Sequence, residues 1–288
     1  MAMIDLHSHS TASDGTKSPS EIIRMAVKEW KEGPILVALT DHDTVAGVEE
    51  FLKEAACYPA QIRAVGGIEL STYYKNQSIH MLGYGIDVQD ETLRRSLQLF
   101  RDRRDARNIK IIERLNALGM KIEVEDIRSE DPEASIGRPI IARYLMKHGY
   151  VSSVKEAFSK YIGKGKPCYV DREKPELKEV IDLIHQSKGI AVMAHPVQYD
   201  KLSMEEIDRL IASLVEIGLD GIEVYYSKNT PDITAHYKAL AERYHLIATG
   251  GSDYHGEVKP DIALFYGRGD LLVPDEILTP FLTALERK

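Results

Sequence analysis

The sequence predicts an α/β fold in which about seven strands close, or nearly close, into a barrel that a helical insertion interrupts. Short apolar stretches such as 35–39 and 190–194 alternate with stretches of helical period, which indicates a parallel sheet with helices outside it. These apolar stretches lack alternating polar residues, as is typical of strands buried on both faces. Histidines and carboxylates follow several of them, and active sites of such barrels lie at the carboxyl ends of the strands.

The opening strand introduces the first pair of candidate metal ligands. Residues 3–6 lead directly into His7-Ser8-His9. Residues two apart on a strand share a face, so His7 and His9 point the same way and are spaced to hold one metal ion. Taken alone, the pair also fits solvated histidines near a flexible terminus. Further ligands at equivalent positions would favour the metal site.

Such positions recur along the chain. The predicted strands with their candidate residues are 35–39 with His42, 62–68 with Glu69, 78–84 with His80 inside it, 190–194 with His195, and 246–249 with Asp253 and His255. A further strand is predicted at 221–225, and Asp14 lies in the polar loop after the first strand. The predicted helices begin with a capping box at Ser18 and Glu21 and continue near 45–56, 177–188, 204–217 and 232–244.

Residues 91–167 break this rhythm and predict an inserted helical domain, so the barrel domain comprises 1–90 and 168–288. Helical patterns in the insertion cover 92–119, 139–148 and 153–161. The insertion holds 17 Lys and Arg against 11 Asp and Glu, whereas the rest of the chain holds 20 against 34. The excess of basic residues predicts that the insertion binds an anion. The alternative is that the basic excess of the insertion and the acidic excess of the rest of the chain are ordinary solvated surfaces.

Composition excludes several classes of protein. The 288 residues are 43% hydrophobic and 28% charged, which is ordinary for a globular protein, and no apolar run is long enough to span a bilayer. The first residues lack a signal-peptide pattern. Cys57 and Cys168 have no metal-binding spacing and predict a reducing compartment, the cytoplasm. We expect no membrane partner and no stable binding of duplex DNA.

The candidate ligands exceed what one metal ion needs, because they comprise six histidines and three carboxylates. Mixed imidazole and carboxylate ligation suits manganese, iron or zinc, and the absence of cysteine ligands argues against a structural zinc site. Bound divalent ions would lower the pKa of water and neutralise charge on an attacked phosphoryl group. The sequence contains no Gly-x-Ser-x-Gly elbow, Walker A loop or Gly-x-Gly-x-x-Gly motif.

At this point the residues carry a family resemblance. The motif set resembles that of the polymerase-and-histidinol-phosphatase (PHP) superfamily. The matching motifs, in order, are Asp5-Leu6-His7-Ser8-His9-Ser10, Ser13-Asp14-Gly15, Thr40-Asp41-His42-Asp43, Gly67-Ile68-Glu69, His80, Ala194-His195-Pro196 and Gly251-Ser252-Asp253-Tyr254-His255. The resemblance spans the chain outside the insertion. It implies a distorted (β/α)7 barrel of the TIM type with a dinuclear or trinuclear metal site.

The resemblance also implies a distribution of ligands over two or three divalent ions. By analogy, His7, His9, Glu69 and Asp253 hold the first ion. The second ion is held by Glu69, His80 and His195, with Glu69 bridging the first two ions. The third ion is held by Asp14, His42 and His255. We expect Mn²⁺, with Fe²⁺, Zn²⁺ and Mg²⁺ as alternatives. Asp253 or His255 is also expected to assist proton transfer, although the sequence identifies no general acid.

The helical insertion before Ala194-His195-Pro196 is similar to that of a bacterial branch of the superfamily, which includes 3′,5′-nucleoside bisphosphate phosphatases and 5′-3′ exoribonucleases acting on short RNA. The resemblance therefore implies hydrolysis of a phosphate ester in a small phosphorylated metabolite, with a nucleoside 3′,5′-bisphosphate or a short oligoribonucleotide favoured. The alternatives are histidinol-phosphate phosphatase, a metal- or nucleotide-binding module without turnover, and a carbon–nitrogen hydrolase of the amidohydrolase type.

Three further residues are candidates for supporting roles. Arg138, at a predicted helix start in the basic insertion, is expected to bind substrate phosphate, because guanidinium pairs with phosphate oxygens in a bidentate way. An exposed surface arginine is the alternative. Asp41 either orients a ligand histidine or is a solvated loop carboxylate. Lys259 either reaches a phosphate or is a surface lysine, and the sequence favours the latter.

Overall fold

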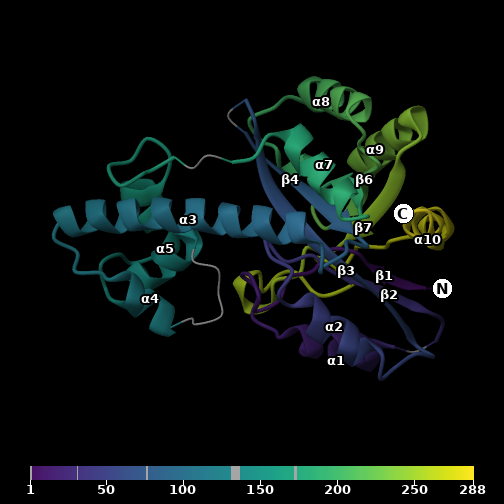
Figure 1. Cartoon of the computed structure of the whole chain (residues 1–288), viewed down its shortest axis with the longest axis horizontal. Helices are drawn as coiled ribbons and strands as arrows, with labels where there is room; N and C mark the ends of the chain where they lie inside the picture. Colours follow the sequence, from purple (N-terminus) through teal and green to yellow (C-terminus); the bar gives the residue numbers. More distant parts are fainter. Residues whose placement is uncertain (1, 31, 76, 131–136, 172–173) are drawn as a thin grey trace. The chain divides into compact units, whose positions relative to one another are not determined.

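The computed structural model describes residues 2–30, 32–75, 77–130, 137–171 and 174–288. It divides into two compact units, one formed by residues 1–95 and 174–288 and the other by residues 96–173. Among the described residues, no helix combines the length and apolar character that crossing a membrane requires. The first unit carries the strands and the second is helical (Figure 1).

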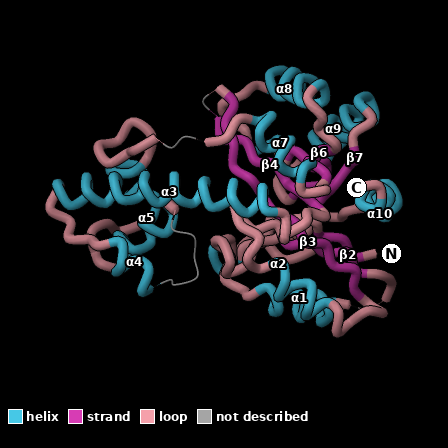
Figure 2. The backbone as a smooth tube through the Cα atoms, viewed as in Figure 1, coloured by secondary structure: helices cyan, strands magenta, loops and turns pink. Residues whose placement is uncertain are grey.

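The first unit is a seven-stranded, nearly closed barrel with the strands in chain order (Figures 1 and 2). Its strands are β1 (Met3–Asp5), β2 (Ile35–Leu39), β3 (Ile62–Tyr74), β4 (Gln77–Tyr84), β5 (Ile190–Met193), β6 (Gly221–Tyr226) and β7 (Ile247–Gly251). The first and last strands meet where Leu6 N donates to Gly250 O at 3.0 Å and Ser8 bridges Tyr254. The predicted barrel class is confirmed.

The expectation of a wholly parallel sheet is wrong at β4, which runs antiparallel to both β3 and β5. The prediction that a strand ends at Ile68 is also wrong, because β3 continues to Tyr74. The run Ser71-Thr72-Tyr73-Tyr74 is rich in β-forming residues and prolongs β3 into a hairpin with β4. Consequently, Glu69 lies within a strand rather than at its end.

β2 illustrates why the barrel strands are apolar throughout. Its side chains alternate between the two faces, and both faces are covered. Leu36 and Ala38 belong to the apolar cluster of the barrel interior. Residues 35, 37 and 39 belong to a second cluster, which is formed with the outer helices α1 (Pro19–Glu29) and α2 (Val48–Ala55). The predicted capping box of α1 is confirmed, since Ser18 and Glu21 each accept a hydrogen bond from the other's backbone N–H.

The amino-terminal end of the barrel is closed by α10 (Leu278–Glu286), which the sequence did not predict. Phe281 is fully buried, and its ring lies edge-on to that of Tyr84, with centroids 5.2 Å apart. Val273 and Ile277 join the same interior cluster. The remaining helical elements of this unit are α7 (Leu177–Gln186), η2 (Pro196–Gln198), α8 (Met204–Glu216), α9 (Pro231–Tyr244), η3 (Gly256–Val258) and η4 (Asp275–Ile277).

The second unit has an apolar core of its own. Its elements are most of α3 (Glu91–Ala117), then α4 (Val124–Glu130), α5 (Arg138–Lys147), α6 (Val154–Ala157) and the π-helical turn η1 (Phe158–Ile162). Fully buried members of this core include Ile111, Leu115, Ile141 and Leu145. The long helix and the helix near 139–148 are confirmed, whereas the helix predicted at 153–161 is divided into α6 and η1. The sequence did not predict α4.

Candidate metal centre

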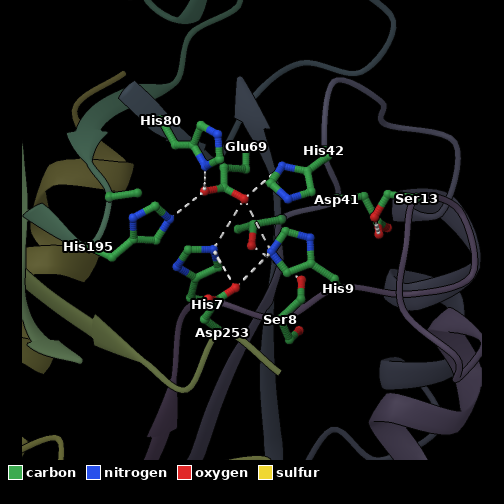
Figure 3. A network of polar contacts seen from close by, with 12 residues as sticks. His7, Ser8, His9, Ser13, Asp41, His42, Glu69, His80, His195 and Asp253 are labelled. Atoms are coloured by element: carbon green, nitrogen blue, oxygen red, sulfur yellow. Dashed lines mark hydrogen bonds and ion pairs between the residues drawn. The ribbon is translucent and has the colours of Figure 1, made fainter. Parts of the chain in front are cut away.

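Nine side chains were expected to converge, and the structure brings them into one cluster beyond β1, β2, β5 and β7, with Glu69 and His80 supplied by β3 and β4. Figure 3 shows seven of them, all except Asp14 and His255. The carboxylate of Glu69 is fully buried and lies at the centre. Its Oε1 is 2.8 Å from His80 Nδ1 and 2.9 Å from His195 Nε2. Its Oε2 is 2.9 Å from His42 Nδ1, 3.3 Å from His9 Nε2 and 3.5 Å from His7 Nε2.

Asp253 faces the same two histidines of the opening motif. Its Oδ1 lies 3.4 Å from His9 Nε2 and 3.7 Å from His7 Nε2. His7, His9 and Asp253 come from opposite ends of the chain, yet backbone contacts between the residues that follow β1 and β7 place them side by side, with Asp253 N donating to His7 O at 2.9 Å. The two histidines therefore have buried partners and are not solvated residues of a loose terminus.

A second group forms around Asp14. Its Oδ1 is 3.3 Å from His255 Nε2 and 3.8 Å from His9 Nδ1, and its Oδ2 is 3.9 Å from His42 Nε2. The two nitrogens of His9 thus face different carboxylates. Among the described residues, three overlapping sets have ligand atoms close enough together to share an ion: His9 with Asp14, His42 and His255; His7 with His9 and Glu69; and His42 with Glu69 and His80.

The cluster fits divalent metal ions because it contains buried polar atoms that form no hydrogen bond within the part of the chain that the structure describes. These atoms include His7 Nε2, both ring nitrogens of His9 and Glu69 Oε2. Buried polar groups are almost always hydrogen-bonded in folded proteins, so several unpaired ligand atoms aimed at one place indicate a cation-binding site. Neutral imidazoles and ionised carboxylates are the ligands that manganese, iron and zinc accept.

Electrostatics within the cluster keep the carboxylates ionised. Burial alone would favour the neutral acid of Glu69, but His42, His80 and His7 hold the pKa of this carboxyl well below its usual range. Burial also opposes charge on His42, yet Glu69 and Asp14 raise its pKa to about 9. His42 would therefore have to lose a proton before it could hold a divalent cation, since a ligand imidazole must be neutral.

The chain matches the PHP domain family over residues 5–263. It belongs to this family. The PHP chain is 35% identical to the 5′-3′ exoribonuclease Rnm of Escherichia coli over 251 residues, which cover 87% of this chain and 84% of the relative. It is 34% identical to the 3′,5′-nucleoside bisphosphate phosphatase of Chromobacterium violaceum over 264 residues, 88% of each protein.

A solved structure from Bifidobacterium adolescentis, classified as a metal-dependent phosphoesterase, matches the PHP chain with a TM-score of 0.81. The two are 30% identical, and the match covers 99% of this chain and 96% of that one. The resemblance inferred from the motifs is therefore confirmed. Because the named relatives are hydrolases of phosphate esters, the expected enzyme class, a hydrolase acting on phosphate ester bonds, is confirmed as well.

Asp41 plays neither of the roles predicted for it in the PHP chain. It is buried, and its carboxylate accepts hydrogen bonds from Ser10 N at 2.7 Å, Ser10 Oγ at 2.7 Å and Ser13 Oγ at 2.5 Å. Its partners are therefore hydroxyl and amide groups of the loop that carries Asp14, rather than a histidine (Figure 3). Asp41 shapes that loop.

Two other residues hold Asp253. Lys259 Nζ donates to Asp253 Oδ2 at 2.7 Å, and Tyr226 OH donates to the same oxygen at 2.9 Å. The preference for Lys259 as a surface lysine is wrong, because its ammonium group pairs with a candidate ligand. Tyr226 was not predicted to take part, since a tyrosine at the end of an apolar strand carries no signal that distinguishes it from a packing residue.

Glu223 was also missed, although the sequence contains a signal for it. Its side chain is fully buried, and its Oε1 lies 2.9 Å from His7 Nδ1. A carboxylate inside the apolar stretch 221–226 has to find a buried partner, because an unpaired buried charge is costly.

Arg138 begins α5 as predicted. Its guanidinium lies 5.4 Å from the ring of Tyr169 and 5.9 Å from that of Phe158.

Proposed function

We propose that this PHP protein hydrolyses a phosphate monoester of a small phosphorylated metabolite, with a nucleoside 3′,5′-bisphosphate as the favoured substrate. The 5′ end of a short oligoribonucleotide is the second candidate. One observation carries the proposal: buried, unpaired ligand atoms of His7, His9 and Glu69 converge beside Asp253 in a chain of this family. The named activities of two relatives support the substrate class.

We propose two or three divalent ions in this centre, with Mn²⁺ favoured over Fe²⁺, Zn²⁺ and Mg²⁺. The proposed ligands are His7, His9, Glu69 and Asp253 for the first, Glu69, His80 and His195 for the second, and Asp14, His42 and His255 for the third. When bound, such ions lower the pKa of water and offset charge on a phosphoryl group. Since His9 Nδ1 also faces Asp14, His9 is a further candidate ligand for the third ion.

The hydrogen bonds of His255 prepare it for a role in ligation or proton transfer. Its Nδ1 lies 2.9 Å from the backbone oxygen of Asp253, which can only accept, so Nδ1 carries a proton and the neutral ring presents the lone pair of Nε2 to Asp14. Burial and the neighbouring His9 lower the pKa of His255, which favours the neutral ring near pH 7. We propose Asp253 and His255 as the groups that assist proton transfer.

Cationic side chains beside the centre favour an anionic substrate. Lys259 pairs with Asp253, and Lys228 Nζ donates to Gln198 Oε1 at 3.3 Å. Burial lowers the pKa of Lys228, and the nearby charge of Lys259 lowers it further, so the two ammonium groups lie close enough to repel. A phosphate group would relieve that repulsion.

We further propose that Arg138 binds a substrate phosphate that the metal ligands do not hold.

The decisive experiment combines metal analysis with a substrate panel. Adenosine 3′,5′-bisphosphate, histidinol phosphate and a 5′-phosphorylated dinucleotide are compared on protein of known metal content. We expect the highest kcat/KM with the bisphosphate. A preference for histidinol phosphate would overturn the substrate assignment. A metal-replete protein that is inert towards every phosphoester would favour a binding module instead.

A further inference from the structure

Glu223 is a buried carboxylate that lies behind the candidate metal ligands and has both oxygens engaged. Its Oε1 is 2.9 Å from His7 Nδ1, and its Oε2 accepts a hydrogen bond from the backbone N–H of His195 at 2.7 Å. Its side chain is fully buried. Glu223 therefore joins two residues that β1 and β5 deliver to the centre from distant parts of the chain.

The contact with Glu223 determines which nitrogen of His7 is available. A carboxylate can only accept, so Nδ1 of the neutral ring carries the proton and Nε2 keeps its lone pair. Nε2 is the nitrogen that has no hydrogen-bond partner and that faces Glu69 Oε2 at 3.5 Å and Asp253 Oδ1 at 3.7 Å. A histidine that ligates a metal usually donates its other ring N–H to such a partner.

Irregular pairing of β6 explains how this strand reaches several ligands at once. Glu223 pairs with Thr249 and Tyr226 pairs with Gly251. A step of three positions along β6 therefore matches a step of two positions along β7. Side chains alternate along a regular strand, and residues three apart would face opposite sides. The bulge, with its extra residue at Val224, brings Glu223 and Tyr226 to one face.

The same face of β6 thus contacts three candidate ligands. Glu223 holds the ring of His7 and the backbone of His195, while Tyr226 OH donates to Asp253 Oδ2 and leaves Oδ1 towards the histidines. The backbone of His195 has φ 25°, an uncommon conformation for a residue other than glycine. The hydrogen bond from His195 N to Glu223 helps to maintain it.

We propose that Glu223 is a positioning residue of the metal centre: it fixes the tautomer and ring orientation of His7 and the backbone of His195. This inference rests on the metal centre of the proposed function, though not on the identity of the substrate. Glu223 is not itself a candidate ligand, because both of its oxygens are engaged by His7 and His195.

Glu223→Gln tests the proposal because an amide offers one acceptor where the carboxylate offers two. The backbone N–H of His195 can only donate, so the amide oxygen is expected to turn towards it. The amide NH₂ group then faces His7 Nδ1 and requires a lone pair there, which moves the ring proton to Nε2. We expect Mn²⁺ affinity about 10- to 100-fold weaker, as is usual when such a partner is lost.

The measurements are Mn²⁺ affinity by competition with a fluorescent chelator, the ¹⁵N shifts of the histidine rings, and kcat and KM at low and saturating Mn²⁺. Weakened affinity, a moved ring proton and partial rescue of kcat by excess Mn²⁺ are expected, with KM little changed. Glu276→Gln is the matched control, because Glu276 pairs with Tyr225 of the same strand on the protein surface and should retain wild-type affinity.

The outcomes separate this inference from the proposed function. Wild-type Mn²⁺ affinity in folded Glu223→Gln would overturn the positioning role, even if the enzyme hydrolyses bisphosphates. Weakened affinity in a protein inert towards every phosphoester would support the positioning role and overturn the function. A wild-type protein that binds no divalent ion would overturn both. Should Glu223→Gln fail to fold, the ¹⁵N shifts of the wild-type His7 ring provide the second test. A neutral ring with its proton on Nδ1 would support the role of Glu223, and a neutral ring with its proton on Nε2 would contradict it.

Discussion

The two ends of the barrel differ in how their buried groups are satisfied. At the amino-terminal end, Phe281 and its neighbours are apolar and pack against one another. At the carboxyl end, the buried groups are imidazoles and carboxylates, and several of their atoms lack hydrogen-bond partners. Tyr84 connects the ends, because its ring packs on Phe281 while its hydroxyl donates to Leu6 O at 2.8 Å.

This difference indicates a division of roles. Apolar burial stabilises the fold at one end, whereas grouped charges and uncommon backbone conformations are maintained at the other. His195 and Asp253, with φ 25° and 60°, both lie at the carboxyl end. Such features persist where the surrounding structure fixes them, and they cluster at functional sites. Changes at the two ends should therefore have separable effects on activity and stability.

The largest expected effect comes from removing a ligand at the carboxyl end. His7→Ala or His9→Ala should lower kcat/KM by about 10³-fold or more, because loss of the metal removes several kcal/mol of charge stabilisation. Circular dichroism should show a folded protein, since the barrel does not need its candidate ligands to close. Substantial activity in either variant would mean that the His7-Ser8-His9 motif is not part of the metal centre.

The opposite pattern is expected at the amino-terminal end. Phe281→Ala removes a fully buried ring and should lower the free energy of unfolding in urea by about 3–5 kcal/mol. The kcat/KM of the folded protein should stay within about twofold of wild type. Leu272→Ala is the control, because this side chain is 64% exposed and its loss should change stability by no more than about 0.5 kcal/mol. A fall in metal affinity of Phe281→Ala would show that the ends are coupled.

What could be predicted from the sequence follows the same division. Periodicity and strand-end positions were enough for the barrel class and for the convergence of His7, His9 and His42, because a barrel of mostly parallel strands gathers their ends. Glu69 joins them from within β3, which continues past the strand end expected at that point. The direction of β4 was not predictable, since a hairpin and a crossover are alternatives that depend on tertiary pairing. Lys259 and Tyr226 were missed as partners of Asp253, because these contacts depend on the tertiary fold rather than on any local sequence pattern.

Removal of the metal should lower both the activity and the stability of the protein. Chelation should abolish turnover and also lower the unfolding temperature, because an ion that binds only the folded state stabilises it by about 2.7 kcal/mol at 100 times its Kd. Added Mn²⁺ should restore both. The stabilisation should be absent in His7→Ala and retained in Phe281→Ala, as differential scanning calorimetry with and without Mn²⁺ can determine. Full activity after chelation and dialysis would contradict the metal centre.

Arg138 extends the comparison to the helical unit. Arg138→Ala should raise KM for a nucleoside bisphosphate about tenfold, because a charge-assisted hydrogen bond contributes roughly 1.5–3 kcal/mol. Arg138→Lys should have an intermediate effect, since it keeps the charge and loses the bidentate geometry. Lys155→Ala, an exposed basic residue of α6, is the control. An unchanged KM in Arg138→Ala would remove this residue from the substrate site.

The smallest expected effect concerns a polar contact that, unlike the metal centre, is fully paired. Asp220 accepts hydrogen bonds from His185 Nε2 at 2.7 Å and from Ala191 N at 2.8 Å, where β5 begins. Burial raises the pKa of Asp220, but these bonds outweigh it and leave the pKa below the ordinary value of 3.8. A lowered pKa means that the carboxylate contributes its full stabilisation above about pH 3.8, and that this contribution is lost as the pH falls from there through the lower pKa of the folded state.

Asp220→Asn should therefore be less stable than wild type by about 1 kcal/mol at pH 7, a value that allows for solvent screening of a partly exposed group. The difference should vanish in strong acid, where both side chains are neutral. Urea unfolding at a series of pH values measures this difference, and a gap that persists in strong acid, below the lowered pKa of Asp220 in the folded state, would indicate a packing effect. Metal affinity should not change, because Asp220 precedes β6 and the candidate ligands gather at the opposite end of the barrel.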